Sequence, residues 1–199
     1  MVLNLSVPEL KELKPKITVF GVGGAGGNNM FAYSYAHESG LTGTVTYVNA
    51  ADAVTDVSST SYGLEFTGME GLTIGYAQQD VEVTTNTKSD ESTMYATYAV
   101  GGLTIGYQTS EYDAPTASAS DDSTAIGISY AVNDNLSISY NEHTVDVGSS
   151  ATDQESDGIS ASYTMGSIGI SAFANKVDNA GGTTGVSKEA KGVTVSFSF

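Results

Sequence analysis

Few residues of this 199-residue chain are of the types that carry out catalysis. It has no cysteine and two histidines, His37 and His143. They lie in different segments, without a serine or cysteine pattern beside either, so we expect no nucleophile–histidine pair. Acidic clusters at 121–122 and 153–157 offer oxygen ligands, but they lack the spacing of an EF-hand loop, and we interpret them as solvated loops. We therefore predict no enzyme activity, no metal site and no cofactor.

A glycine-rich stretch near the start could hold a phosphate. Ile17 to Phe20 read as a strand, and Gly21 to Asn28 follow as a loop whose backbone N–H groups could cradle an anion. The stretch Lys16 to Asn28 resembles the opening of FtsZ, the bacterial homologue of tubulin, over about the first 28 residues. The second phosphate loop and the acidic residues of that family have no counterpart. We interpret residues 1–30 as an FtsZ-like segment with a short helix, not a complete domain, and Ile17 to Gly23 as one more strand.

The remaining residues repeat one unit. In Thr97 to Tyr107, two stretches of alternating apolar and small residues meet at Gly101-Gly102, which predicts a tight β-hairpin. Five such units follow one another, and their second halves begin at Leu41, Leu72, Leu103, Leu136 and Ile168. Three of these second halves carry a tyrosine four residues later: Tyr76, Tyr107 and Tyr140. The repeat predicts five hairpins in series over residues 31–199.

Turns and loops alternate in length. We expect strands at 31–38, 41–49, 60–67, 72–83, 92–100, 103–111, 123–132, 136–147, 157–165, 168–176 and 189–199. Short turns join alternate pairs, and long polar loops at 50–59, 84–91, 112–122, 148–156 and 177–188 join the others. Short turns at one end and long loops at the other are typical of an outer-membrane barrel. The predicted fold is all-β, a transmembrane antiparallel up-and-down barrel of about 11–12 strands.

The two faces of these strands differ. Glu65 lies between Leu64 and Phe66, so it should point away from the apolar face and into a lumen. Gln79, Asn141 and His143 are further lumen candidates. One aromatic residue lies beside each short turn, as an interfacial girdle would: Tyr35, Phe66, Tyr98, Tyr130 and Tyr163.

The net charge of the chain limits the kinds of partner that we expect. The chain carries 23 acidic and 7 basic residues, all of the latter lysine, for a net charge of −16. Nucleic-acid binding depends on Lys and Arg that neutralise phosphates, so we expect no nucleic-acid partner. Acidic loops favour cations over anions in any channel that they surround.

The last strand alternates strictly. Val193, Val195, Phe197 and Phe199 share one face and end the chain on an aromatic residue. From about residue 31 the chain resembles the C-terminal part of Gram-negative porins, particularly small acidic ones of marine α-proteobacterial type, although Thr194 replaces the family's usual glycine. The resemblance implies an outer-membrane diffusion channel, truncated relative to 16 strands. It also implies contact with membrane lipid and lipopolysaccharide, recognition of the last strand by the barrel-assembly machinery, and a homotrimer.

Three other interpretations remain open. No signal peptide is read in Met1 to Lys16, so the chain as written would not be exported. It could therefore be a chimeric reading frame, an FtsZ beginning joined to a porin end, without a native role. A non-channel barrel, such as an adhesin-like surface protein, is a second alternative. A nucleotide-binding protein that uses Gly21 to Asn28 is a third.

Overall fold

The described residues of the computed structural model form one antiparallel sheet. They are residues 16–18, 29–49, 58–84, 87–116, 119–150 and 152–198. The expected helix before Lys16 and the glycine-rich loop lie outside them. The strands are β1 (Lys16–Thr18), β2 (Asn29–Ala36), β3 (Leu41–Asn49), β4 (Ser58–Met69), β5 (Leu72–Thr84), β6 (Thr87–Val100), β7 (Leu103–Asp113), β8 (Asp121–Asn133), β9 (Leu136–Val147), β10 (Gln154–Met165), β11 (Ile168–Asp178) and β12 (Lys188–Phe197).

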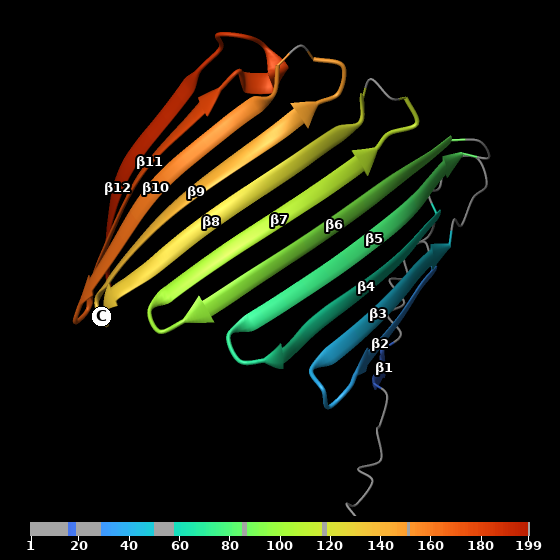
Figure 1. Ribbon diagram of the computed structural model, residues 1–199, viewed down its shortest axis with the longest axis horizontal. Coiled ribbons are helices and arrows are strands. Elements are labelled where there is room, and N and C mark those ends of the chain that lie inside the picture. Colours follow the sequence, from blue (N-terminus) through green and yellow to red (C-terminus); the bar gives the residue numbers. More distant parts are fainter. Residues whose placement is uncertain are drawn as a thin grey trace, which may run out of the picture.

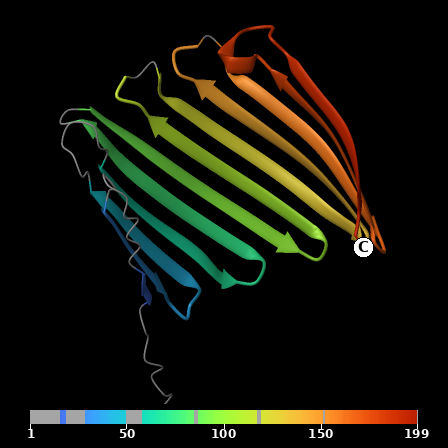
Figure 2. The same cartoon turned by 180° about the vertical axis from the view of Figure 1, so that it is seen from behind.

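Each strand pairs with the next one along the chain, so the sheet is a 12-stranded meander in the order β1 to β12. Figures 1 and 2 show a single curved layer, with β1 at one edge and β12 at the other. The sheet is not closed, because no pairing joins β12 to β1 among the described strands. This confirms the predicted all-β up-and-down fold with about 11–12 strands. No helix in the described part of the chain is long and apolar enough to span a membrane.

The sequence repeat corresponds to a repeated hydrogen bond at the short turns. In each case a carbonyl at the turn accepts the backbone N–H of a residue in the next hairpin. The pairs are Gly40 with Thr67, Gly71 with Ala99, Gly102 with Ala131, Asn135 with Thr164, and Ser167 with Ser198, at 2.7–2.9 Å. Gly71 has φ +74°, and a Cβ at this position would overlap the Ala99 carbonyl, so this turn requires glycine. We call this end of the sheet the short-turn rim, and the opposite end the long-loop rim.

One expected loop was wrong. Residues 84–91 were predicted to form a long loop, but β5 continues to Thr84 and β6 starts at Thr87. The sequence stops alternating in polarity there, and that loss of alternation suggested the end of a strand. Backbone pairing continues without it, and Glu82 lies directly opposite Lys88 in the ladder, a favourable cross-strand pair of charges. β8 and β10 begin earlier than expected in the same way, at Asp121 and Gln154.

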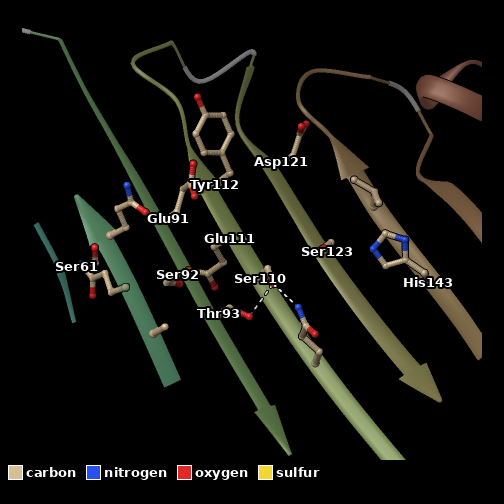
Figure 3. Close-up of a pocket in the computed structure, with 15 residues that line it drawn as sticks. Ser61, Glu91, Ser92, Thr93, Ser110, Glu111, Tyr112, Asp121, Ser123 and His143 are labelled. Carbon is tan, nitrogen blue, oxygen red and sulfur yellow. Dashed lines mark hydrogen bonds between the residues drawn. The ribbon is translucent and has the colours of Figure 1, made fainter. Parts of the chain in front are cut away.

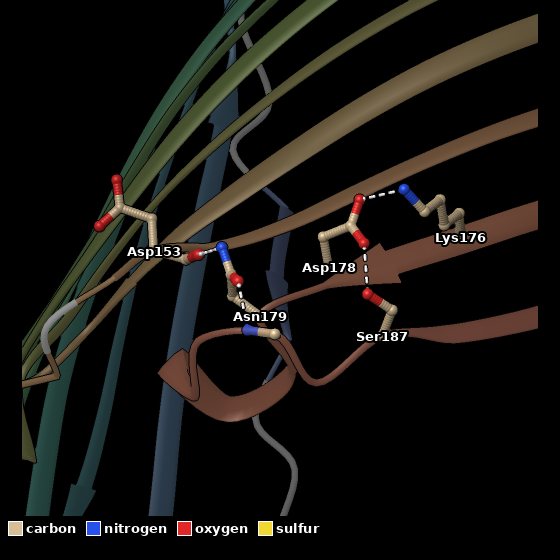
Figure 4. A network of polar contacts seen from close by, with 6 residues as sticks. Asp153, Lys176, Asp178, Asn179 and Ser187 are labelled. Carbon is tan, nitrogen blue, oxygen red and sulfur yellow. Dashed lines mark hydrogen bonds and ion pairs between the residues drawn. The ribbon is translucent and has the colours of Figure 1, made fainter.

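The connection between β11 and β12 is organised by two side chains (Figure 4). Asn179 adopts φ +51° before the 3-10 turn η2 (Ala180–Gly182). Its amide donates to the Asp153 carbonyl, and its Oδ1 accepts the Gly185 N–H, both at 3.2 Å. Asp178 accepts a hydrogen bond of 2.6 Å from Ser187 and forms an ion pair with Lys176. These contacts tie the connection to the ends of β10 and β11.

The sheet has no core of the kind found in water-soluble domains. None of the hydrophobic side chains among the described residues is buried. Large apolar residues along one face stay half exposed, for example Leu64 at 54%, Ile126 at 50% and Ile159 at 58%. Soluble monomers rarely expose an apolar surface that runs across so many strands, so this face needs an apolar environment.

Candidate functional site

Register separates the sheet into two faces of opposite character. Residues directly opposite each other in an antiparallel ladder share a face. One row runs across the sheet through Ser61, Gln79, Glu91, Tyr112 and Asp121. The next row toward the short-turn rim runs through Gly63, Ala77, Thr93, Ser110, Ser123 and Val145. We call the face that carries these rows the polar face, and the opposite one the apolar face.

The polar face is hollowed near the long-loop rim. A cavity of about 600 Å³ lies against it, lined among others by Gln79, Glu91, Gln108, Tyr112, Asp121 and His143. In Figure 3, Glu91, Tyr112, Asp121 and His143 come from neighbouring strands of the sheet. Thr93 and Ser110 hydrogen bond across β6 and β7 at 2.9 Å, and Gln108 donates to Ser110 at 3.2 Å. The cavity wall thus carries hydroxyls, amides and carboxylates beside the apolar side chains of Ala77 and Val145.

The four lumen candidates lie on the polar face. Glu65 pairs with Gly75, and Gly75 lies on the same face of β5 as Gln79. Asn141 and His143 share one face of β9, where they pair with Gly127 and Ala125 of β8. Gln79 and His143 line the same cavity, whereas Glu65 and Asn141 do not. The four residues are therefore spread over one wall and do not form a single cluster.

Glu65 and Asn141 each have close neighbours. The Tyr95 hydroxyl donates to Glu65 Oε2 at 2.5 Å, from a strand two positions away. Asn141 on β9 and Asn175 on β11 flank Gly158 of β10, where an added Cβ would lie 3.1 Å from the Asn141 Oδ1 and 2.5 Å from the Asn175 Oδ1. Glycines at 75 and 158 thus leave room for side chains of adjacent strands to lie along the wall.

Charge on the polar face is mostly negative. On strands β2 to β12, its described carboxylates are Glu65, Glu91 and Asp121, and the described lysine is Lys188 at the first residue of β12. Glu91 and Asp121 flank Tyr112 in one row. A cation that moves along this wall therefore meets favourable charge on β4, β6 and β8.

Four polar-face residues were not among the predicted lumen residues: Glu91, Tyr95, Gln108 and Asp121. The signal was present for two of them. Met94, Ala96 and Tyr98 stand at alternate positions of the sequence and so share one face, which leaves Tyr95 on the other. Gln108 likewise lies on the face opposite to Tyr107. Glu91 and Asp121 were assigned to loops because the apolar alternation begins only after each of them.

The predicted aromatic row lies on the apolar face near the short-turn rim. Tyr98, Tyr130 and Tyr163 are 39–46% exposed, and Tyr35 and Phe66 are half-buried. A second row lies about four residues further along the strands, roughly 13 Å away, and includes the three tyrosines that recur in the sequence repeat. It consists of Tyr47, Tyr62, Tyr76, Tyr107 and Tyr140.

Polar groups begin directly beyond the second aromatic row. Tyr62 and Tyr76 both donate to Gln78, and Tyr140 donates to Glu142. Carboxylates such as Asp90 and Asp157 continue on this face toward the long-loop rim. Apolar residues between two aromatic rows, with charges outside, have the order of residue types found on the lipid-facing side of a membrane barrel, over about half of the roughly 25 Å height of such a band.

The acidic clusters are divided between the two faces. Asp121 and Asp122 are consecutive residues of β8 and point to opposite sides. Glu155 and Asp157 are in β10, on the face opposite to Ser156. In contrast to the expected loops, these carboxylates belong to strands. Within the described ranges there is no group of three or more metal-ligating side chains.

The terminal strand β12 pairs with β11 from Lys188 to Phe197. Val193, Val195 and Phe197 lie on the apolar face and are 72%, 50% and 60% exposed. Phe199 lies outside the described residues. The alternation expected for the last strand is therefore present up to Phe197.

Comparison with known families gives two matches of different extent. The Gram-negative porin family matches residues 13–182. FtsZ of Caulobacter vibrioides is 51% identical over 53 residues, which are 27% of this chain and 10% of that protein. FtsZ 1 of Rhizobium meliloti is 49% identical over 53 residues, 27% of this chain and 8% of its own length. Both resemblances are confirmed, and the FtsZ match is longer than the 28 residues expected.

Solved structures share the architecture of the sheet. An anion-selective porin from Comamonas acidovorans has a TM-score of 0.64 at 15% identity, over 84% of this chain and 57% of that one. A porin refined at 1.8 Å has a TM-score of 0.65 at 14% identity, over 86% and 62%. The outer-membrane expressed OmpT of Vibrio cholerae has a TM-score of 0.56 at 14% identity, over 83% of this chain and 62% of that one. The chain spans about three fifths of each of these structures, and the likeness at these identities concerns the fold.

Proposed function

The chain belongs to the Gram-negative porin family, and from this premise we propose that it forms a passive channel for ions and small hydrophilic solutes with a preference for cations. Porins are outer-membrane proteins that carry out no chemical step. We extend both properties to this chain: location in the outer membrane, in contact with its lipid, and no enzymatic activity.

The observation that carries the proposal is the division of the sheet into a polar and an apolar face without a buried core. Apolar residues between two aromatic rows suit contact with lipid, and the hollowed polar face suits contact with water. In hydrocarbon, unpaired backbone groups at a sheet edge are costly, so the two edges must be joined in the membrane. β1 and β12 run antiparallel, because they are the first and last of an even number of strands in an antiparallel meander, and they are therefore suited to neighbour each other in a closed barrel.

The cation preference is proposed from the charges on this chain's own wall. The Comamonas porin is named anion-selective although its fold is similar, so the fold does not set the sign of selectivity. Here Glu65, Glu91 and Asp121 lie on the polar face, and Lys188 lies at a strand end. We propose Glu65, Gln79, Asn141 and His143 as residues of the channel wall. The cavity-lining residues Glu91, Gln108, Tyr112 and Asp121 belong to the same wall.

Planar-bilayer recording of the detergent-refolded chain tests this function. Under a KCl gradient we expect stepwise openings and a reversal potential of cationic sign. A variant with Glu65→Gln, Glu91→Gln and Asp121→Asn should keep the openings and lose most of the cation preference. An anionic reversal potential for the unmodified chain would disprove the selectivity, and a silent bilayer with β-rich, folded protein would disprove the channel.

Further partners follow from family membership. We propose that carboxylates beyond the second aromatic row contact lipopolysaccharide through divalent cations, and that the barrel-assembly machinery binds β12, with its exposed Val193, Val195 and Phe197. A homotrimer is also proposed. Chemical cross-linking of the reconstituted protein tests it, and a monomer band alone would contradict it.

The FtsZ match supports a second proposal, about origin. A segment of 53 residues is close to FtsZ, while the porin family already matches from residue 13. We propose that residues 1–30 are an FtsZ-like segment joined to a porin-like barrel at 31–199. A continuous single-molecule DNA read across codons 25 to 35 would support a real fused gene, and two separate reading frames in that read would contradict it.

A further inference from the structure

Three residues of the polar face lie in one row across three strands. Glu65 of β4 pairs with Gly75 of β5, and Gly75 pairs with Tyr95 of β6. The Tyr95 side chain spans the middle strand and donates its hydroxyl to Glu65 Oε2 at 2.5 Å. This is a charge-assisted hydrogen bond, of the stronger kind in proteins.

Gly75 makes this contact possible. It is buried, and a Cβ built on it would overlap the Tyr95 ring and lie 2.6 Å from its hydroxyl oxygen. The backbone of Gly75 is not in the left-handed region, so the absence of a side chain is what the position requires. The ring therefore lies flat along the wall over Gly75.

The contact changes what Glu65 presents to a passing ion. Glu65 is exposed on the wall, and one of its carboxylate oxygens is occupied by the phenol. Divalent cations bind several oxygens and often take a carboxylate through both of them. Conduction requires binding that is favourable enough for entry and weak enough for exit.

We propose that Tyr95 is a positioning residue that holds Glu65 against the wall, so that the channel attracts cations without trapping divalent ones. The inference rests on the proposed cation channel. Loss of the Tyr95 hydroxyl frees the second oxygen of Glu65 and lets the carboxylate reach into the lumen. Calcium then binds there long enough to block potassium current.

Calcium block of single-channel potassium current tests the proposal. Tyr95→Phe should lower the half-blocking calcium concentration roughly ten- to a hundredfold, the range expected from one hydrogen bond to a charged group. Glu65→Gln should raise that concentration above the value of the unmodified chain. Adding Tyr95→Phe to Glu65→Gln should change nothing further, because Tyr95 acts through Glu65.

Two matched variants separate the contact from general disturbance. Gly75→Ala should displace the ring and reproduce the effect of Tyr95→Phe, whereas Gly127→Ala, where a Cβ meets nothing within 4 Å, should not. Tyr107→Phe on the apolar face should also leave calcium block unchanged. An unaltered block in Tyr95→Phe, or an equal shift with and without Glu65, overturns the proposal.

A second measurement needs no channel, so that failure of the channel is distinguished from failure of this contact. Carbodiimide-coupled amine labelling of the folded protein in detergent, read by mass spectrometry, compares Glu65 with Glu91 as an internal reference. Tyr95→Phe should raise labelling of Glu65 several-fold relative to Glu91. Equal ratios in both proteins overturn the proposed positioning, whatever the bilayer shows.

Discussion

At the scale of single residues, a shift of one position along a strand changes the environment of a side chain completely. Thr104 and Ile105 are consecutive in β7, yet Thr104 pairs with Ser129 on the polar face and Ile105 pairs with Ile128 on the apolar face. Ile105 is 45% exposed, between the two aromatic rows. In the proposed orientation, Thr104 meets water and Ile105 meets lipid.

This difference gives a prediction for charged substitutions. Ile105→Lys should destabilise the protein folded into lipid vesicles by about 1–4 kcal/mol, the cost of a lysine inside the apolar band of a barrel. Thr104→Lys should cost far less, because its ammonium stays in water. Urea titrations in vesicles, followed by tyrosine fluorescence, measure both free energies of unfolding. Equal costs at the two positions would contradict the assignment of the faces.

At the scale of elements, the short turns hold successive hairpins together through one carbonyl each. Gly71 and Gly101 both have positive φ, +74° and +57°. They differ in their surroundings, because a Cβ at Gly71 would overlap the Ala99 carbonyl whereas a Cβ at Gly101 meets nothing within 4 Å.

These two glycines form a matched pair. Gly101→Ala should cost about 1–2 kcal/mol of stability, from the left-handed backbone alone. Gly71→Ala should cost about 1–3 kcal/mol more, since the backbone carbonyl must also move. The same urea titration compares them, and a Gly101→Ala variant that is the less stable of the two would contradict the close contact.

The connection after β11 depends on Asn179 in a comparable way. Asn179→Ala removes the two side-chain hydrogen bonds of Asn179 and leaves an alanine in the left-handed backbone conformation, at φ +51°. Asn179→Gly removes the same bonds but tolerates the backbone, so it should cost about 1–2 kcal/mol less. Hydrogen exchange of residues 179–187 should rise in both variants and more in Asn179→Ala. Faster exchange in Asn179→Gly would contradict this account.

Much of this architecture could be predicted from the sequence, because alternation and glycine turns are local signals. The bounds of β3 and β9 were predicted to the residue, and the unit around Gly101-Gly102 is a hairpin. Several other strand ends at the long-loop rim were not, since Lys88, Asp121 and Gln154 belong to the backbone ladder without an apolar pattern. The contact of Tyr95 with Glu65 across Gly75 depends on the register of three strands, which no single strand's sequence contains.

At the scale of the whole molecule, the two faces of the sheet suit different surroundings, lipid on one side and water on the other. The described residues provide no buried hydrophobic core, and the two edges, β1 and β12, remain unpaired with each other. Three observations indicate that one face contacts lipid: the porin family match, the porin fold and the apolar band between aromatic rows. The central claim is that the other face lines a water-filled path for ions.

Single-cysteine modification during bilayer recording tests that claim most directly, because the native chain has no cysteine. Gln108→Cys places a thiol on the polar face, and Tyr107→Cys places one on the apolar face, one residue away. A membrane-impermeant, positively charged thiosulfonate should lower the potassium conductance of Gln108→Cys in a single step and leave Tyr107→Cys unchanged. Modification that alters Tyr107→Cys alone, or open channels in which neither thiol affects conductance, would contradict the polar face as the wall of the channel.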